Sequence, residues 1–291
     1  VGLDVGGTKT AVIVETVDGV RVLATEVASD GWDAEPLDHG VRWIADHLAR
    51  LVPDGYSVVG VGIGAQGLDT PEISEGFAAA LSGFGYAALA VNDAALLVPA
   101  AGHLTGIGLI SGTGAIGVGA DALGHPLITG GWGWVIGDEA GAAGIVREAT
   151  RAALLAHDDG EPDDGLLGAL CTAFGVTDAE RLARAVNDVP TMDNWGPRAP
   201  AVFAAADEGS ALAVAVIDGA AEHLARLVDQ LVARGAVGET VVAAGSVIVG
   251  QPRLCAGVVD RVGQRHPDLT VELLTRPPVE GALALARRAS T

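Results

Sequence analysis

Two glycine turns and a few isolated acids are the residues of this chain best suited to chemistry. The first turn, Gly6-Gly7-Thr8, stands between two apolar runs, which predicts a hairpin of buried strands. Glycines let the backbone turn tightly and direct N–H groups onto a phosphate, and the Thr8 hydroxyl adds a donor. Asp4 would lie beside that anion, which requires a cation between them, most naturally Mg²⁺. An ordinary hairpin whose glycines only make the turn fits the same pattern.

A second turn of this kind, Gly112-Thr113-Gly114, separates another two apolar runs. Phosphoryl transfer needs phosphate-binding loops, a metal ion, and a base that orients the attacking hydroxyl. Asp93 is the candidate base because it stands where a short strand gives way to a helix, and a carboxylate with a pKa near ~3.9 is charged at neutral pH. The alternative is that Asp93 is only the N-cap of that helix.

Trp132 and Asp138 fit a carbohydrate site. An indole face packs on the C–H groups of a sugar ring, and a carboxylate accepts hydrogen bonds from neighbouring hydroxyls. The alternative is a core tryptophan and a helix cap, since Asp138 or Glu139 would begin a helix. Gly245-Ser246 follows an apolar strand and leaves room for the flat ring of an adenosine, although a glycine after a strand is common.

The elements that must position these residues alternate between strands and helices. Beyond the opening hairpin, strands are predicted at 20–27, 58–63, 88–91, 105–111, 115–119, 240–244 and 270–274, and helices at 36–52, 94–100, 140–155, 166–174, 179–187, 210–234, 253–262 and 278–288. Pro36 is expected at the first position of its helix. Gln66 lies in a loop at the C-terminal end of a strand, where open α/β sheets collect ligands.

The second glycine hairpin indicates that the fold begins again near residues 99–102. We therefore predict an α/β fold with two related lobes that face each other across a central cleft. The N-terminal lobe would span residues 1–100 and the C-terminal lobe residues 101–291, with helical insertions in the second lobe and a last helix that packs back on the first.

Composition limits the classes of function. The formal net charge of −20 and only 17 Lys and Arg residues argue against nucleic acid as a partner. A phosphate ligand must then be bound locally, by backbone N–H groups and a metal ion. No apolar run approaches a membrane span and no signal peptide is visible, so the protein is expected to be soluble and cytoplasmic. Cys171 and Cys255 have no metal-ligand spacing and fit a reducing compartment.

Several motifs together resemble a known family. They are Asp4-Val5-Gly6-Gly7-Thr8-Lys9-Thr10, Asn92-Asp93-Ala94, Ser111-Gly112-Thr113-Gly114, Gly130-Gly131-Trp132-Gly133, Gly137-Asp138-Glu139, Ala244-Gly245-Ser246 and Pro278-Val279-Glu280-Gly281-Ala282. Their order and spacing are similar to those of BadF/BadG-type ATPases, and within these to N-acetylglucosamine kinases and bacterial glucosamine kinases.

The resemblance implies an actin-like, ribonuclease-H-like kinase that closes on ATP, with Mg²⁺, and an amino sugar, and that is a homodimer. It makes Asp93 the catalytic base and Asp4 the acid on the Mg²⁺ side. By position the nucleotide contacts are Gly6, Gly7, Thr8, Lys9, Gly112, Thr113, Gly114, Gly245 and Ser246, and the sugar contacts are Asp30, Gln66, Asn92, Gly131, Trp132 and Asp138. The apolar helix at 210–234 would suit the dimer.

Two positions depart from the N-acetylglucosamine kinase pattern. Asp30 stands where those enzymes tend to have Asn, and Gln66 where they tend to have Ser. An acid near the C2 substituent favours a free ammonium by charge pairing, which tilts the expected substrate towards glucosamine. Alternatives on the same fold are a sugar-responsive repressor, which would carry a helix-turn-helix ahead of the first hairpin, and the ATPase activase of a dehydratase, whose cluster cysteines are expected near the second turn.

Overall fold

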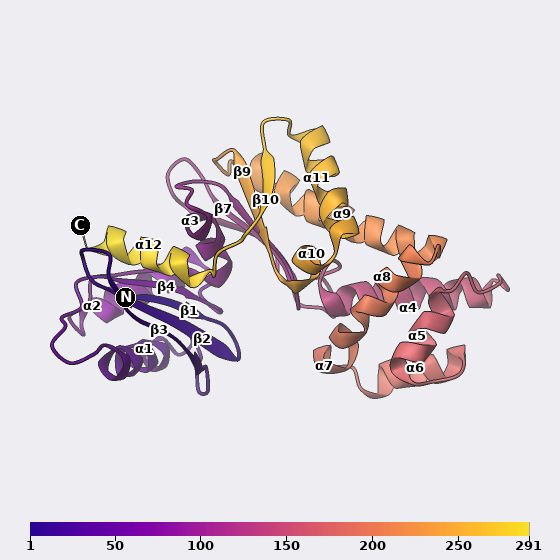
Figure 1. The fold of residues 1–291 in the computed structure, drawn as a ribbon, viewed down its shortest axis with the longest axis horizontal. Helices are drawn as coiled ribbons and strands as arrows, with labels where there is room; N and C mark the ends of the chain where they lie inside the picture. Colours follow the sequence, from indigo (N-terminus) through magenta and orange to yellow (C-terminus); the bar gives the residue numbers. More distant parts are fainter. Residues whose placement is uncertain (291) are drawn as a thin grey trace.

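The computed structural model describes residues 1–290, and within them the strands form two five-stranded sheets (Figure 1). The first sheet contains β1 (Gly2–Val5), β2 (Lys9–Glu15), β3 (Arg21–Ala28), β4 (Val61–Ala65) and β5 (Ala88–Asn92). The second contains β6 (Ile107–Ser111), β7 (Ala115–Ala120), β8 (Pro126–Gly130), β9 (Thr240–Ala244) and β10 (Thr270–Leu273).

The two sheets have the same topology. Their strand orders are β3-β2-β1-β4-β5 and β8-β7-β6-β9-β10 when both are read from the hairpin edge. In each, the first three strands pair antiparallel and the last two add in parallel to the first. The predicted repetition of the glycine hairpin is thus a repetition of the whole sheet, and the α/β fold class is confirmed.

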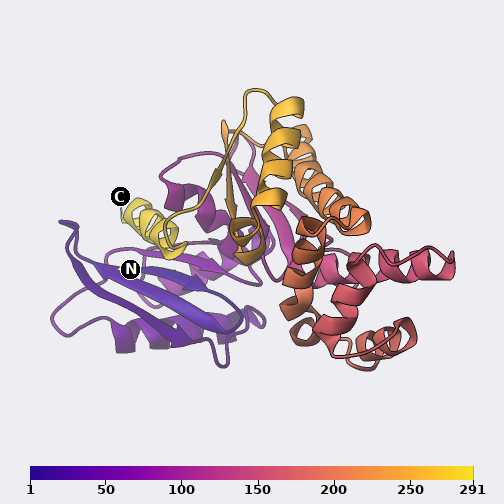
Figure 2. The same ribbon diagram turned by 45° about the vertical axis from the view of Figure 1, so that its right-hand side comes forward.

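Helices cover both sheets and form an additional layer in the second half of the chain. They are α1 (Leu37–Leu51), α2 (Pro71–Ser82), η1 (Asp93–Leu96), α3 (Leu97–Ala101), α4 (Ala142–Asp158), α5 (Leu166–Phe174), α6 (Ala179–Asp188), α7 (Met192–Trp195), η2 (Gly196–Arg198), α8 (Ala199–Asp207), α9 (Ala211–Ala233), α10 (Ser246–Gly250), α11 (Pro252–Arg265) and α12 (Val279–Ala289). Helices α4 to α8 lie on the far side of the second sheet from the first (Figures 1 and 2).

The last helix, α12, lies on the first sheet although it follows the second in sequence (Figures 1 and 2). Glycines permit this contact. A Cβ atom at Gly2 would lie 2.5 Å from Leu283 N, and one at Gly62 would overlap the Ala282 carbonyl oxygen. The backbone of α12 therefore rests directly on β1 and β4. This agrees with the predicted return of the last helix, while the exact division at residue 100 stays a prediction.

The largest core belongs to the second half of the chain. Its fully buried side chains include Leu109, Ile145 and Leu224, which join β6, α4 and α9 in one cluster. Helix α9, expected to suit a dimer, has its apolar face committed to this core. A separate cluster built around Leu3, Ile63 and other residues fills the first half.

Some predicted boundaries are wrong. Pro36 precedes α1 as its N-cap, Gly141 caps α4 in place of Asp138 or Glu139, and the strand predicted at 58–63 runs from Val61 to Ala65. Asp138 has a positive φ of 53°, so it turns the chain before α4 begins. Helices α2, α7, α8 and α10, the short 3-10 helix η2 and strand β8 were not predicted.

No single helix among residues 1–290 is long and apolar enough to cross a membrane. Helices Met192–Asp207 and Ala211–Ala233 reach that length and composition only together, across a 119° bend.

Candidate active site

Three parallel strands of the first sheet bring the predicted acids to one edge. β1 pairs with β4, which pairs with β5, so that Val5, Ala65 and Asn92 lie side by side. Carboxyl ends of parallel strands meet at the same edge, and ligands bind there. Asp4 and Asp93 therefore lie at one end of the sheet, together with Asn92 and the loop that contains Gln66.

Asp93 lies close enough to Asp4 for its charge to affect the protonation of Asp4. Burial, and next the charge of Asp93, raise the pKa of Asp4 to about 7. Burial is also the main reason why the pKa of Asp93 is raised, partly offset by the Ala94 N–H and reinforced by the charge of Asp69. Negative charge is thus concentrated at this edge, and a cation would relieve it.

Asp93 begins η1, which is wedged between the two sheets. The Ala94 N–H donates to both Asp93 Oδ1 and Asn92 Oδ1, each at 2.9 Å. On one side Leu96 fills the space above Gly64 of β4, and on the other the Ala94 carbonyl faces Gly108 of β6, where a Cβ atom would lie 2.8 Å away. The predicted base therefore stands on a buried element that contacts both halves of the chain.

The first glycine turn lies beside this edge. The Gly6 N–H donates to the Lys9 carbonyl at 3.0 Å, which closes the turn. A Cβ atom at Gly7 would lie 2.8 Å from Gln66 Oε1, so glycine there allows the two loops to approach. The Lys9 ammonium lies 3.4 Å from Glu26 on an exposed face. The phosphate contacts of Gly6, Gly7, Thr8 and Lys9 stay predictions.

Two tryptophans support the loops expected to bind the sugar. Trp43 Nε1 donates to the Asp30 carbonyl at 3.0 Å, and Trp32 Nε1 donates to the Gln66 carbonyl at 3.2 Å. Their rings pack edge to face with centroids 5.4 Å apart. Asp30 and Gln66 are exposed and lie on a common aromatic support, although neither tryptophan was selected from the sequence.

In the second half, the structure brings the second glycine turn and the predicted adenosine loop together. Gly245 has a φ of 105° and packs against the end of β6, where a Cβ atom would overlap the Ser111 carbonyl oxygen. A Cβ atom at Gly112 would lie 3.5 Å from both Gly245 Cα and Ser246 N, so the turn and this loop are neighbours. The Ala142 N–H at the start of α4 donates to the Gly112 carbonyl at 2.8 Å. Thr113 and Gly114 thus lie beside a helix N-terminus, a place that favours anions.

Asp138 lies against this second turn. A Cβ atom at Gly114 would lie 2.7 Å from Asp138 Oδ2. Burial raises the pKa of Asp138, and backbone N–H groups of Ala115 and Gly133 offset part of that rise. Oδ1 of this carboxyl group is buried without a hydrogen-bond partner. A buried acceptor without a partner is costly, so Asp138 is suited to accept a ligand hydroxyl.

Trp132 belongs to the same loop, and its side chain is 75% exposed. Gly131, its neighbour, has a φ of 71° and donates its N–H to the Ala115 carbonyl at 2.9 Å. Arg147 of α4 holds the loop from below, since its guanidinium donates to the Trp134 and Gly137 carbonyls. Trp132 is thus an exposed ring on an anchored loop, not the core aromatic of the alternative interpretation.

The residues at the first edge fit a hydrated metal ion better than a cage of protein ligands. Among residues 1–290, no group of three or more His, Cys, Asp or Glu side chains is placed to hold a metal. Asp4 and Asp93, whose charges are poorly compensated, would suit an ion that keeps most of its waters and shares phosphate oxygens, as Mg²⁺ does.

Sequence reasoning missed two side chains that hold predicted site residues. Asp69, in the loop after β4, accepts a hydrogen bond from the Asn92 carboxamide, and Arg147 anchors the Trp132 loop. Asp69 lies after the C-terminal end of a strand, as Asp93 does, which was the available signal. Hollows of about 570 and 810 Å³ are lined by other residues, between the starts of α1 and α2 and along α4 and α9.

The sequence model of the BadF/BadG/BcrA/BcrD ATPase family matches residues 1–284, nearly the whole chain. The chain belongs to this ATPase family. The resemblance seen in the motifs is thus confirmed at the level of the family.

Individual relatives of this BadF/BadG/BcrA/BcrD ATPase carry kinase names. The N-acetylmuramic acid/N-acetylglucosamine kinase of Clostridium acetobutylicum is 30% identical over 171 residues, and the match spans only 54% of each chain. The N-acetyl-D-glucosamine kinase of Dictyostelium discoideum is 24% identical over 309 aligned positions that cover 98% of this chain and 97% of that one.

A solved structure supports the fold. A Chromobacterium violaceum protein described as a candidate N-acetylglucosamine kinase superposes with a TM-score of 0.68 and 21% identity, covering 98% of this chain and 97% of its own. At that identity the likeness shows that the two share the two-lobed ATPase fold.

Proposed function

We propose that this protein is an ATP-dependent hexosamine kinase that phosphorylates N-acetylglucosamine or glucosamine at the 6-hydroxyl. The observation that carries the proposal is the position of Asp93 on η1, at the edge where three parallel strands end and between the two sheets. The backbone holds Oδ1, and the other oxygen can accept a hydroxyl proton. The kinase names of relatives in the same ATPase family support this assignment.

The roles of the other residues follow from their positions. Bound ATP and Mg²⁺ would supply the transferable phosphoryl group and compensate its charge. The Gly6 and Gly112 N–H groups close the two glycine turns, and the other N–H groups of Gly6-Gly7-Thr8 and Gly112-Thr113-Gly114 would bind phosphate oxygens, with Asp4 on the metal side. Gly245 and Ser246 lie beside the second turn, where they would contact the adenosine. Trp132 and the unpartnered Oδ1 of Asp138 would contact the sugar ring and a hydroxyl.

The choice between the two amino sugars depends on the loops near Asp30 and Gln66. Both relatives are named for N-acetylated sugars, whereas the exposed carboxylate of Asp30 favours a free ammonium. The proposed class is therefore an amino sugar. We further propose a cytoplasmic homodimer, to be checked by light scattering.

The test is an ADP-release assay with glucosamine, N-acetylglucosamine, N-acetylmannosamine and glucose. Turnover is expected with at least one of the first two sugars, and phosphorus–proton NMR of the product should place the phosphate on O6. Asp93→Asn is the inactive control, and Asp54→Asn, in the exposed loop between α1 and β4, is the matched control. Tight sugar binding without any ADP release would instead indicate a sugar-sensing regulator on the same fold and would refute the kinase proposal.

A further inference from the structure

Asp69 lies in the loop that joins β4 to α2, close to the predicted base. Its Oδ1 accepts a hydrogen bond from Asn92 Nδ2 at 2.7 Å. Asn92 is the last residue of β5, and β5 is the parallel neighbour of β4. The contact therefore ties the loop after one strand to the end of the next, at the edge that carries Asp93.

This contact fixes the orientation of the Asn92 carboxamide. Asp69 takes one N–H of Nδ2, while Asn92 Oδ1 accepts the Ala94 N–H at 2.9 Å. The two ends of the carboxamide are thus distinguished, because an amino group cannot accept from Ala94 and a carbonyl oxygen cannot donate to Asp69. One N–H of Asn92 remains to donate to a ligand.

The same backbone group joins Asn92 to the predicted base. The Ala94 N–H is shared between Asn92 Oδ1 and Asp93 Oδ1, both at 2.9 Å. A shift of the Asn92 side chain would change how this N–H is divided between the two acceptors. The position of the Asp93 carboxylate therefore depends on Asn92, and through it on Asp69.

Helix capping does not account for Asp69. Thr70 is the N-cap of α2, and its hydroxyl oxygen accepts the Ile73 N–H at 3.3 Å. The Asp69 side chain is exposed and uses its carboxylate for Asn92. Asp69 is thus an exposed acid whose carboxylate binds a buried neighbour at the strand ends where ligands are expected. A positioning role explains this contact.

We propose that Asp69 is a positioning residue of the sugar site, and this inference rests on the proposed kinase function. Asp69 holds the Asn92 carboxamide so that its free N–H meets a sugar hydroxyl while Asp93 receives the hydroxyl to be phosphorylated. Asp69 itself touches neither the nucleotide nor the transferred group. Its loss should loosen sugar placement and leave nucleotide binding unchanged.

The contact can be tested without any ligand. Asn92, Asn187 and Asn194 are the asparagines of the chain, so asparagine-selective ¹⁵N labelling gives three carboxamide signal pairs. Asn187 donates to the Ala183 carbonyl within α6, and Asn194 donates to the carbonyls of Ala185 and Val189, so neither contacts Asp69 and their signals are internal controls. Asp69→Ala should shift the Asn92 pair and speed its hydrogen exchange about tenfold, while the other two pairs stay in place. Asn92→Asp identifies the pair by removing it.

Kinetics test the consequence. Asp69→Ala should lower kcat/KM for the sugar about 10- to 100-fold and leave KM for ATP within about twofold. Asp69→Asn keeps an acceptor oxygen but loses the charge, so it should recover most of the activity. Asp54→Asn, at the opposite edge of the first sheet, should match the wild type.

The outcomes separate the two proposals. If the wild type turns over, three results would each overturn the positioning role. They are an unshifted Asn92 signal pair in Asp69→Ala, unchanged sugar kinetics in that variant, and an Asp69→Asn variant as impaired as Asp69→Ala. A wild type that phosphorylates no amino sugar, with the Asn92 pair still dependent on Asp69, would instead refute the proposed function and with it the catalytic part of this inference.

Discussion

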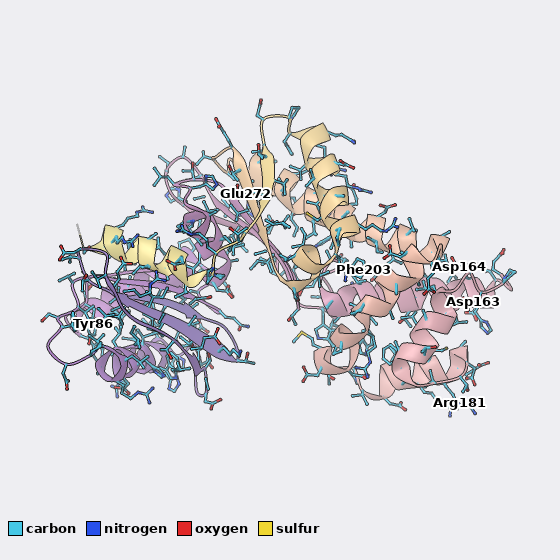
Figure 3. All side chains as sticks on the ribbon, viewed as in Figure 1. Tyr86, Asp163, Asp164, Arg181, Phe203 and Glu272 are labelled. Atoms are coloured by element: carbon cyan, nitrogen blue, oxygen red, sulfur yellow. The ribbon has the colours of Figure 1, made fainter. Side chains whose placement is uncertain are left out.

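Two groups of acids in this molecule show how the surroundings of a carboxylate set its role. Asp4, Asp69 and Asp93 gather at the ends of parallel strands in the first sheet. Asp163 and Asp164 lie in the helical layer of the second half, far from that sheet (Figure 3). The Asp residues of both groups lie near the ends of strands or helices, and the sequence alone does not distinguish the two groups.

The acids of the helical layer are satisfied by the backbone. Asp163 accepts from the N–H groups of Gly165, Leu167 and Gly168 at the start of α5. Asp164 accepts from Leu166 and Leu212 and from the Ser210 hydroxyl, so it caps α5 and joins it to α9. These carboxylates thus have a structural task, and both oxygens of each already accept hydrogen bonds from the chain.

The direction of the pKa shift differs accordingly. Burial acts to raise the pKa of Asp164, but the hydrogen bonds from Leu212, Leu166 and Ser210 outweigh it and the pKa is lowered. At the strand ends, burial raises the pKa of Asp4 and Asp93, with smaller contributions from the charge of Asp93 on Asp4 and of Asp69 on Asp93. Acids that the fold leaves uncompensated are those expected to meet a ligand.

The largest expected effect is on turnover. Asp93→Asn should lower kcat about 10²- to 10⁴-fold because the carboxamide cannot accept the hydroxyl proton, while the sugar still binds. Steady-state kinetics and calorimetric sugar binding measure both quantities. Turnover close to that of the wild type would show that Asp93 is not the base. It would also remove the main difference proposed between the acids of the first sheet and those of the helical layer.

A smaller effect is expected at the unpartnered oxygen of Asp138. Asp138→Asn should raise KM for the sugar about 10- to 100-fold, since a charged acceptor of a sugar hydroxyl is lost. KM for ATP is the control and should change little. Equal losses for both substrates would mean that Asp138 supports the second glycine turn and does not contact the sugar.

Asp4 should make stability depend on pH. The pKa of Asp4 is about 7 in the folded protein, whereas in the unfolded chain it has its ordinary value of 3.8. The folded state therefore binds more protons between these values, and the free energy of unfolding falls as pH rises from about 4 to 7. Asp4→Asn should be more stable than the wild type at pH 7 by on the order of 2 kcal/mol, with no difference at pH 4. Urea unfolding in chelator and without nucleotide measures this.

The smallest effect concerns Asp164, and it should have the opposite sign. Asp164→Ala should lower the free energy of unfolding by about 1 to 2 kcal/mol at neutral pH, because two helix starts lose an acceptor. The loss should disappear as pH falls through the lowered pKa of Asp164, where the wild type becomes protonated. Kinetic constants should stay unchanged, and a change in sugar KM would contradict the separation of the two groups.

Much of the fold and the positions of the site residues could be predicted from local patterns. Glycine between β-branched runs marks both hairpins, and Asp4, Asn92 and Asp93 stand at strand ends, where parallel pairing brings them together. Ranges such as Leu166–Phe174 were predicted correctly because their apolar spacing and flanking glycines are local signals.

The remaining features depend on contacts between distant segments. The link between Asp69 and Asn92 needs the parallel pairing of β4 with β5, and the support of the Trp132 loop by Arg147 needs the packing of α4. A helix cap was the alternative role for Asp138, because an acid before a helix usually is one, yet its left-handed backbone places the carboxylate on the second glycine turn. None of these follows from periodicity.

The contact between α12 and the first sheet has a consequence for synthesis on the ribosome. Strands β1 to β5 are synthesised first, but α12, which covers Gly2 and Gly62, is synthesised only after the second sheet and its helical layer. The nascent first half thus remains uncovered on one face until α12 emerges. We infer that the packing of this face is completed late, after the second sheet has been made.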